Sequence, residues 1–135
     1  MGEKPKENSG MSKDMANEAI TLPDLYYRVA KVCQGVRVLD LYPPMREDDL
    51  WSIGSAGGFH PRISTSMAES LILAACVRWL ADNGRFPEFH KEDESGMYEC
   101  RVYCQEHLEH NTEHKSVAIA ALLAVEAVCK ERSHD

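Results

Sequence analysis

The stretch that decides the fold runs from Phe59 to Leu80 and reads FHPRISTSMAESLILAACVRWL. It opens with a proline and a cluster of Ser and Thr, which are turn-forming and helix-capping residues. Ser66 with Glu69 three residues later forms a capping-box pattern, and Thr65 is an alternative cap. The apolar residues that follow recur at three- and four-residue spacing, so we expect a helix that ends near Asp82.

Upstream of this stretch the pattern predicts one helix and two strands. Thr21, with Pro23 and Asp24 shortly after it, predicts a helix start, and the apolar residues from Leu22 onward share one helix face until Gly35. Val36–Tyr42 is apolar on both faces and predicts a strand that is covered on two sides. Leu50–Ile53 predicts a weaker second strand.

Downstream, two segments predict a β-hairpin. Phe86–Lys91 and Met97–Gln105 are strand candidates, and the turn residues Asp93-Glu94-Ser95-Gly96 lie between them. In the second segment polar and apolar side chains alternate clearly, which is the pattern of a strand.

The remaining chain predicts a polar loop at Glu106–His114 and a helix from about Glu113 to Lys130, capped by Thr112 or Asn111. Within that helix the run from Val117 to Val125 is apolar without interruption, so apolar side chains surround the helix axis. We expect a two-fold homo-oligomer that covers the surplus apolar surface. The alternative is that another helix of the same chain covers it.

These elements predict an α+β fold, with an antiparallel sheet of about four strands packed by three helices in the order helix-strand-strand-helix-strand-strand-helix. Residues 1–20 are polar and without periodicity, which predicts a flexible tail. Residues 21–132 are the expected single domain, a usual length for one.

This arrangement resembles the phage ABA sandwich domain, a family of small bacteriophage and prophage proteins. Three segments carry the likeness: Leu25–Leu41, the Phe59–Thr65 segment that leads into Met67–Glu69, and the Ala118–Val125 run. The chain departs from the family pattern in its short second strand and in the His-rich segment before the last helix. The resemblance implies a fold and a viral setting, and it carries no site residues.

The composition excludes several classes of function. There are 22 acidic and 15 basic residues, a formal charge of −7, and the basic residues form no cluster, which disfavours nucleic-acid binding. No apolar run is long enough to span a membrane. The odd number of cysteines favours free thiols in a reducing cytoplasm; they are Cys33, Cys76, Cys100, Cys104 and Cys129.

A metal site is one candidate for chemistry. Zinc favours thiolate and imidazole ligands, and Cys100, Cys104, His107, His110 and His114 lie close in sequence. The two cysteines are four residues apart on one strand, too far for one ion. The three histidines would align on a helix and could bind zinc, whereas a solvated loop without metal is the simpler interpretation. We expect no required cofactor.

A second candidate is a ligand or partner surface around the glycine-rich segment. It would use aromatic side chains and the donors at the helix start, namely Trp51, Phe59, His60, Arg62 and Thr65. The competing interpretation is that the aromatic residues belong to the core and that Thr65 only caps the helix.

No catalytic signature is present, so we expect a non-enzymatic phage accessory protein that acts by binding. Its partner would be a host protein or a small ligand such as a nucleotide, and antagonism of host defence is one role that suits such a protein. The alternatives are a metal-binding module or metal-dependent hydrolase built on the His-rich segment, and a structural homo-oligomer.

Overall fold

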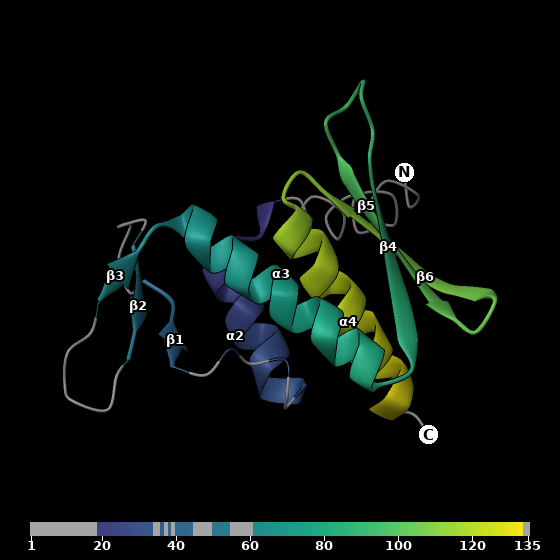
Figure 1. The fold of residues 1–135 in the computed structure, drawn as a ribbon, viewed down its shortest axis with the longest axis horizontal. Coiled ribbons are helices and arrows are strands. Elements are labelled where there is room, and N and C mark those ends of the chain that lie inside the picture. Colours follow the sequence, from purple (N-terminus) through teal and green to yellow (C-terminus); the bar gives the residue numbers. More distant parts are fainter. Residues whose placement is uncertain are drawn as a thin grey trace, which may run out of the picture.

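The computed structural model describes residues 19–33, 36, 38, 40–44, 50–54 and 61–133. Of the predicted tail, only Ala19 and Ile20 belong to this part, and Ile20 packs against the core. The helices lie between two groups of three strands (Figure 1). In chain order the elements are α2 (Leu22–Val32), β1 (Leu41–Tyr42), β2 (Trp51–Ile53), β3 (Arg62–Ile63), α3 (Thr65–Asp82), β4 (Arg85–Lys91), β5 (Tyr98–Cys104), β6 (His107–His114) and α4 (Val117–Ser133).

The strands form two antiparallel sheets, one in the order β1-β2-β3 and one in the order β4-β5-β6. The predicted α+β class is confirmed. Instead of one sheet of about four strands, the described residues form two three-stranded sheets, and β3 and β6 are strands that the sequence pattern did not reveal.

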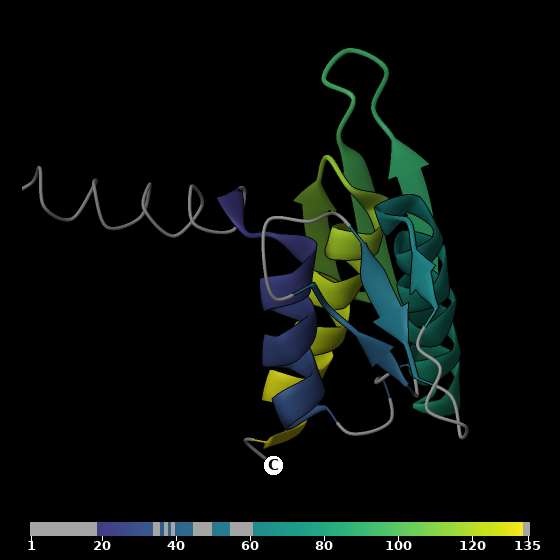
Figure 2. The ribbon, with the colours of Figure 1, turned by 90° about the vertical axis from the view of Figure 1, so that its left-hand side faces the viewer.

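The helices form the middle layer of the molecule. In Figure 2 the small sheet lies in front of the three helices and the larger sheet lies behind them. Contacts agree with this view: Trp51 of β2 meets Tyr26 of α2 edge to face, with ring centroids 5.7 Å apart. On the other side of the helices, α4 contacts β5 and β6, while α3 contacts β4. One buried cluster therefore joins both sheets to the helical layer.

The first helix begins where the sequence predicts. The Thr21 side chain accepts a hydrogen bond from the Asp24 backbone N–H at 3.3 Å, and a proline occupies the first turn. Leu25 and Val29 lie on the buried face of α2. The first helix thus combines three features that the sequence predicts: a cap, a proline in the first turn and one apolar face.

The start of α3 differs from the prediction. Ser64 is the cap, since its hydroxyl accepts the Met67 N–H at 3.3 Å. Ser66 lies inside the first turn, and its carbonyl accepts a bond from the Ser70 hydroxyl. The capping-box prediction at Ser66 is therefore wrong, and so is the Thr65 alternative. Because three neighbouring residues carry hydroxyl groups, the sequence pattern could not identify which of them is the cap. The predicted end of this helix, at Asp82, is confirmed.

The predicted strand Val36–Tyr42 is much shorter in the structure. Of its described residues only Leu41 and Tyr42 form a strand, β1. Asp40 has a φ of 63°, in the left-handed region that extended strands do not use, so the chain turns there. The second predicted strand is confirmed as β2.

The predicted β4–β5 hairpin is confirmed. Its strands pair in regular register from Arg85 with Cys104 to Lys91 with Tyr98. Gly96 completes the turn with a φ of 72°, a conformation that glycine adopts without a steric penalty.

The segment predicted as a polar loop is a strand. β6 covers His107–His114 and pairs with β5 at every position except Glu109. The last helix consequently begins at Val117, three or four residues later than predicted, and the Ser116 hydroxyl caps it by accepting the Ile119 N–H at 3.3 Å. Thr112, a predicted cap, instead donates to the Ala120 carbonyl at 2.6 Å.

The apolar helix α4 is covered within the chain. It contacts α2, α3, β5 and β6, and its residues from Ala118 to Leu122 are all buried. The alternative interpretation therefore holds, and the prediction that α4 forms an oligomer interface is wrong. Self-association itself stays a prediction. No helix among the described residues has the length and apolarity that crossing a membrane requires.

Two of the five cysteines form a disulfide. Cys33, at the end of α2, is bonded to Cys129 of α4 with a Cα–Cα distance of 6.1 Å. The prediction of free thiols is wrong for this pair and correct for Cys76 and Cys100, which are buried, and for the half-buried Cys104. Disulfides are rare in reducing compartments, so the expected cytoplasmic setting does not account for this bond.

Candidate functional site

The face of the β4–β5–β6 sheet that points away from the helices carries a network of charged and polar side chains. Cys100 and Val102 of β5 point into the core and are fully buried. The residues next to them in β5 therefore point to the opposite side of the sheet, which we call the outer face. The cross-strand register arranges nine outer-face residues in three rows: Phe86–Tyr103–Leu108, Glu88–Arg101–Asn111 and His90–Glu99–Glu113.

The first row is apolar and exposed. Phe86 and Leu108 are 65% and 52% exposed, and the half-buried Tyr103 lies between them in the register. Three neighbouring strands thus present an aromatic and aliphatic row to solvent. Exposed apolar groups that adjoin one another, unlike scattered ones, indicate a contact surface.

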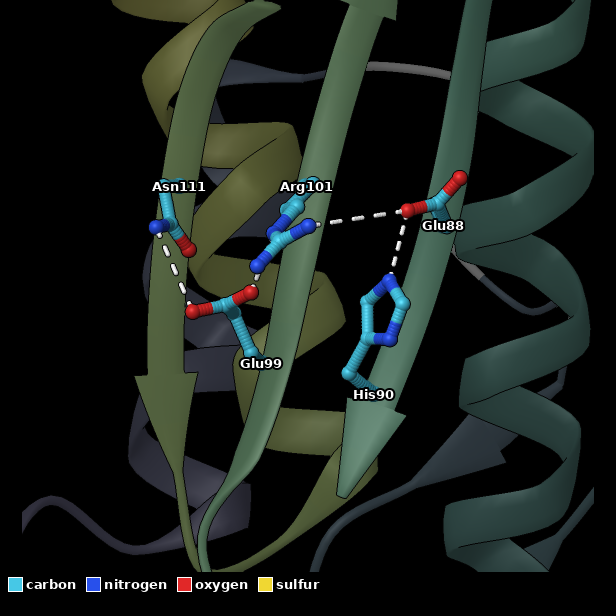
Figure 3. A network of polar contacts seen from close by, with 5 residues as sticks. All are labelled: Glu88, His90, Glu99, Arg101 and Asn111. Atoms are coloured by element: carbon cyan, nitrogen blue, oxygen red, sulfur yellow. Dashed lines mark hydrogen bonds and ion pairs between the residues drawn. The ribbon is translucent and has the colours of Figure 1, made fainter. Parts of the chain in front are cut away.

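The other two rows are tied together by a polar network (Figure 3). Arg101 is at its centre: it donates to Glu99 of its own strand and lies 3.8 Å from Glu88 of β4. Glu88 also contacts His90 at 2.5 Å, and the Asn111 amide of β6 donates to Glu99 at 3.4 Å. The network spans all three strands, which fixes the charged groups relative to one another.

This network shifts the pKa of two of its members. Desolvation raises the pKa of Glu99, but hydrogen bonds from Arg101 and Asn111 outweigh it, so the net pKa is lowered. The same hydrogen bond, seen from the other partner, raises the pKa of Arg101. Both groups are therefore held in their charged forms at neutral pH.

The outer face is acidic. Its nine residues include three carboxylates and one guanidinium, which gives a net charge of −2 when His90 is neutral. Beside the last row, near the hairpin, is a pocket of about 210 Å³ lined by His90, Lys91, Glu92, Met97, Glu99, Arg101 and Glu113. Ligand pockets are usually larger, from about 300 to 1,000 Å³. The face consequently suits contact with a surface better than enclosure of a ligand.

The surface predicted around the glycine-rich segment is only partly described, because Phe59 and His60 lie outside the described residues. Trp51 is 1% exposed and belongs to the core, so its place in a partner surface is a wrong prediction. Thr65 is half-buried in the first turn of α3. Arg62 on β3 is exposed and is the one described member that a partner could reach freely.

The three histidines predicted as metal ligands lie on a strand and do not converge. His107 is exposed at the start of β6, and His114 is buried at its end, where Nδ1 accepts the Ser116 N–H at 3.0 Å. His110 lies between them and contacts Glu131 of α4 at 2.8 Å. The described side chains that do bring ligand atoms together are Glu109, His110 and Glu131. Sequence analysis found His110 but missed both carboxylates.

Comparison with known proteins gives no further assignment. No protein-family model matches the chain, and no curated protein or solved structure matches it. The resemblance to the phage ABA sandwich family therefore stays a prediction from the sequence.

Proposed function

We propose that this chain is a non-enzymatic binding protein whose outer face docks a basic surface of a partner protein. The observation that carries the proposal is the exposed row Phe86–Tyr103–Leu108 beside a fixed, net acidic network. An apolar anchor with charged surroundings is a common composition for a protein interface.

Charge favours a basic partner. Both the outer face and the whole chain are acidic, and complementary charge accelerates encounter and excludes unsuitable partners. A nucleotide suits this face less well, because the three carboxylates that line its pocket outnumber the two cations, Lys91 and Arg101, and leave a net negative charge that repels phosphate groups.

The resemblance to the phage family adds the remaining parts of the proposal. On that basis the partner is a host protein, the protein acts in the host cytoplasm, and its role is to antagonise host defence. A cytoplasmic setting must accommodate the Cys33–Cys129 disulfide, which an oxidising environment would explain more simply.

The test is capture of proteins from bacterial lysate on the immobilised chain at low salt, followed by mass spectrometry. The variant is Phe86→Ser with Leu108→Ser. The matched control is Tyr27→Ser with Val32→Ser, which removes an aromatic and an aliphatic side chain from α2 with exposures of 49% and 63%.

We expect the wild type and the control to retain the same basic proteins, the outer-face variant to lose them, and added salt to release them. Equal retention by the outer-face variant, or proteins that salt does not release, would contradict the proposal.

A further inference from the structure

A β-bulge in β6 gives two consecutive side chains a common direction. Val102 of β5 pairs with His110, whereas the next residue, Tyr103, pairs with Leu108, so Glu109 is an extra residue in the strand. In a regular strand Glu109 and His110 would point to opposite faces. A bulge removes this alternation locally and can redirect a side chain, which is why bulges are frequent beside functional sites.

Because of the bulge, Glu109 and His110 both face the end of α4. There Glu131 completes a group of three potential ligands whose donor atoms lie within 4.8 Å of one another. The His110 Nε2 and a Glu131 carboxylate oxygen are already 2.8 Å apart. The three groups come from β6 and from the far end of α4, two consecutive elements that pack against each other.

We propose that Glu109, His110 and Glu131 bind a divalent transition-metal ion, with Zn²⁺ as the best fit. Imidazole nitrogen and carboxylate oxygen are both zinc ligands, at about 2.0–2.2 Å from the metal. Mg²⁺ and Ca²⁺ prefer oxygen ligands throughout, so the histidine selects against them. Three protein ligands leave one position of a tetrahedral ion open to water or to a ligand.

The distances require a small rearrangement, in which the His110–Glu131 contact opens from 2.8 Å and the other ligand atoms, at most 4.8 Å apart, draw together. Ligand atoms around a tetrahedral zinc ion are about 3.4 Å apart, given the bond lengths above. Glu131 lies in the last turns of α4 with its side chain 44% exposed, so it can adjust its position relative to the other two. The ligand set differs from the three histidines that the sequence predicted and shares only His110 with them.

Arg85 supports the site and leaves a ligand atom free. Its Nε donates to Glu109 Oε1 at 2.9 Å, and both side chains are mostly buried, at 18% and 20% exposed. The second oxygen of Glu109 stays available to a metal. A hydrogen bond of this kind orients a carboxylate ligand and is a usual companion of metal sites. Two carboxylates and one guanidinium also leave a net negative charge that attracts a dication.

The experiment is calorimetric titration of the full, tag-free chain with ZnCl₂, together with the visible spectrum after addition of Co²⁺. The ligand variants are His110→Ala and Glu131→Gln. His90→Ala is the matched control: His90 also contacts a glutamate, Glu88 at 2.5 Å, but on the outer face and without a third ligand group among the described residues.

We expect one Zn²⁺ per chain and a Co²⁺ spectrum in the wild type and in His90→Ala. Each ligand variant should bind zinc at least about tenfold more weakly, since even loss of a group that only orients a ligand costs 10–100-fold. Glu131→Gln retains the side-chain shape at an exposed position, so its loss of binding cannot be assigned to misfolding. Absence of zinc binding in the wild type, or equal affinity in Glu131→Gln, would overturn the proposal.

Discussion

The ion pair between Arg28 of α2 and Glu126 of α4 offers a sharp test of how the helical layer is held together. Arg28 donates from Nε and from Nη2 to the two carboxylate oxygens of Glu126, at 2.6 and 2.8 Å. The Glu126 side chain is 8% exposed and that of Arg28 is 45% exposed. Removing Arg28 would therefore leave a carboxylate buried without its main partner.

The magnitude follows from this asymmetric burial. Loss of one partner from a fully buried pair costs about 3–5 kcal/mol, whereas a fully exposed pair contributes at most about 1 kcal/mol. Solvent screens the half-exposed Arg28, and Lys130 lies 3.8 Å from Glu126 and can replace part of the charge. We expect Arg28→Met to reduce the free energy of unfolding by about 2 kcal/mol, with a pair coupling of about 1–1.5 kcal/mol.

The assay is a double-mutant cycle by urea denaturation with Arg28→Met, Glu126→Gln and both together. The control cycle uses the exposed pair His90 and Glu88, whose side chains are 48% and 42% exposed. Its coupling should stay below about 0.5 kcal/mol. If the Arg28–Glu126 coupling does not exceed that of the control pair, the reasoning from burial is refuted.

Two further predictions concern a helix cap and the free thiols. Ser64→Ala should destabilise the fold by about 1 kcal/mol, because it removes the cap of α3, whereas Ser66→Ala should leave the denaturation midpoint unchanged; equal effects would contradict the cap assignment. Cys104, which is half-buried, should react with iodoacetamide in the native protein at pH 8 well before Cys100, whose pKa burial raises to about 12. Peptide mapping checks the order, and equal rates would mean that β5 opens readily.

The parts of the fold that could be predicted are those in which several local sequence signals indicate the same element. α2 has a cap, a proline and a single apolar face, and the β4–β5 hairpin has two patterned strands around a turn. Such agreement needs no knowledge of the rest of the chain. At α3 the body of the helix was predicted, but the choice among three adjacent hydroxyl residues was not, because it depends on the backbone angles at Ser64.

β6 could not be predicted because the side chains that point toward the helices are polar. His110, Thr112 and His114 contact Glu131, the Ala120 carbonyl and the Ser116 N–H respectively, so they form hydrogen bonds with α4 and its cap where a typical strand would pack apolar groups. Without apolar alternation the segment has the composition of a loop. Only the finished tertiary structure supplies the partners that make this strand stable.

The outer face was missed for a related reason. Phe86, Tyr103 and Leu108 are far apart in sequence, and they form a row only when the register of three strands is known. The bulge adds a further shift of one residue, and with regular pairing Leu108 would lie on the other face. Interpretation of one chain segment at a time cannot recover such a row.

The bulge also connects the two proposed sites. It places Leu108 in the apolar row of the outer face and the adjacent Glu109 beside Arg85, on the side that faces α4. A metal held by Glu109, His110 and Glu131 would restrain the backbone at the neighbouring Leu108. The metal itself would not touch a partner protein. The sites can still be separated by mutation, because Glu131 belongs to α4, on the other side of the sheet from the outer face, and Phe86 is no part of the ligand group. Loss of zinc with unchanged protein capture in Glu131→Gln would show that the bulge keeps its shape through Arg85 and the strand pairing alone.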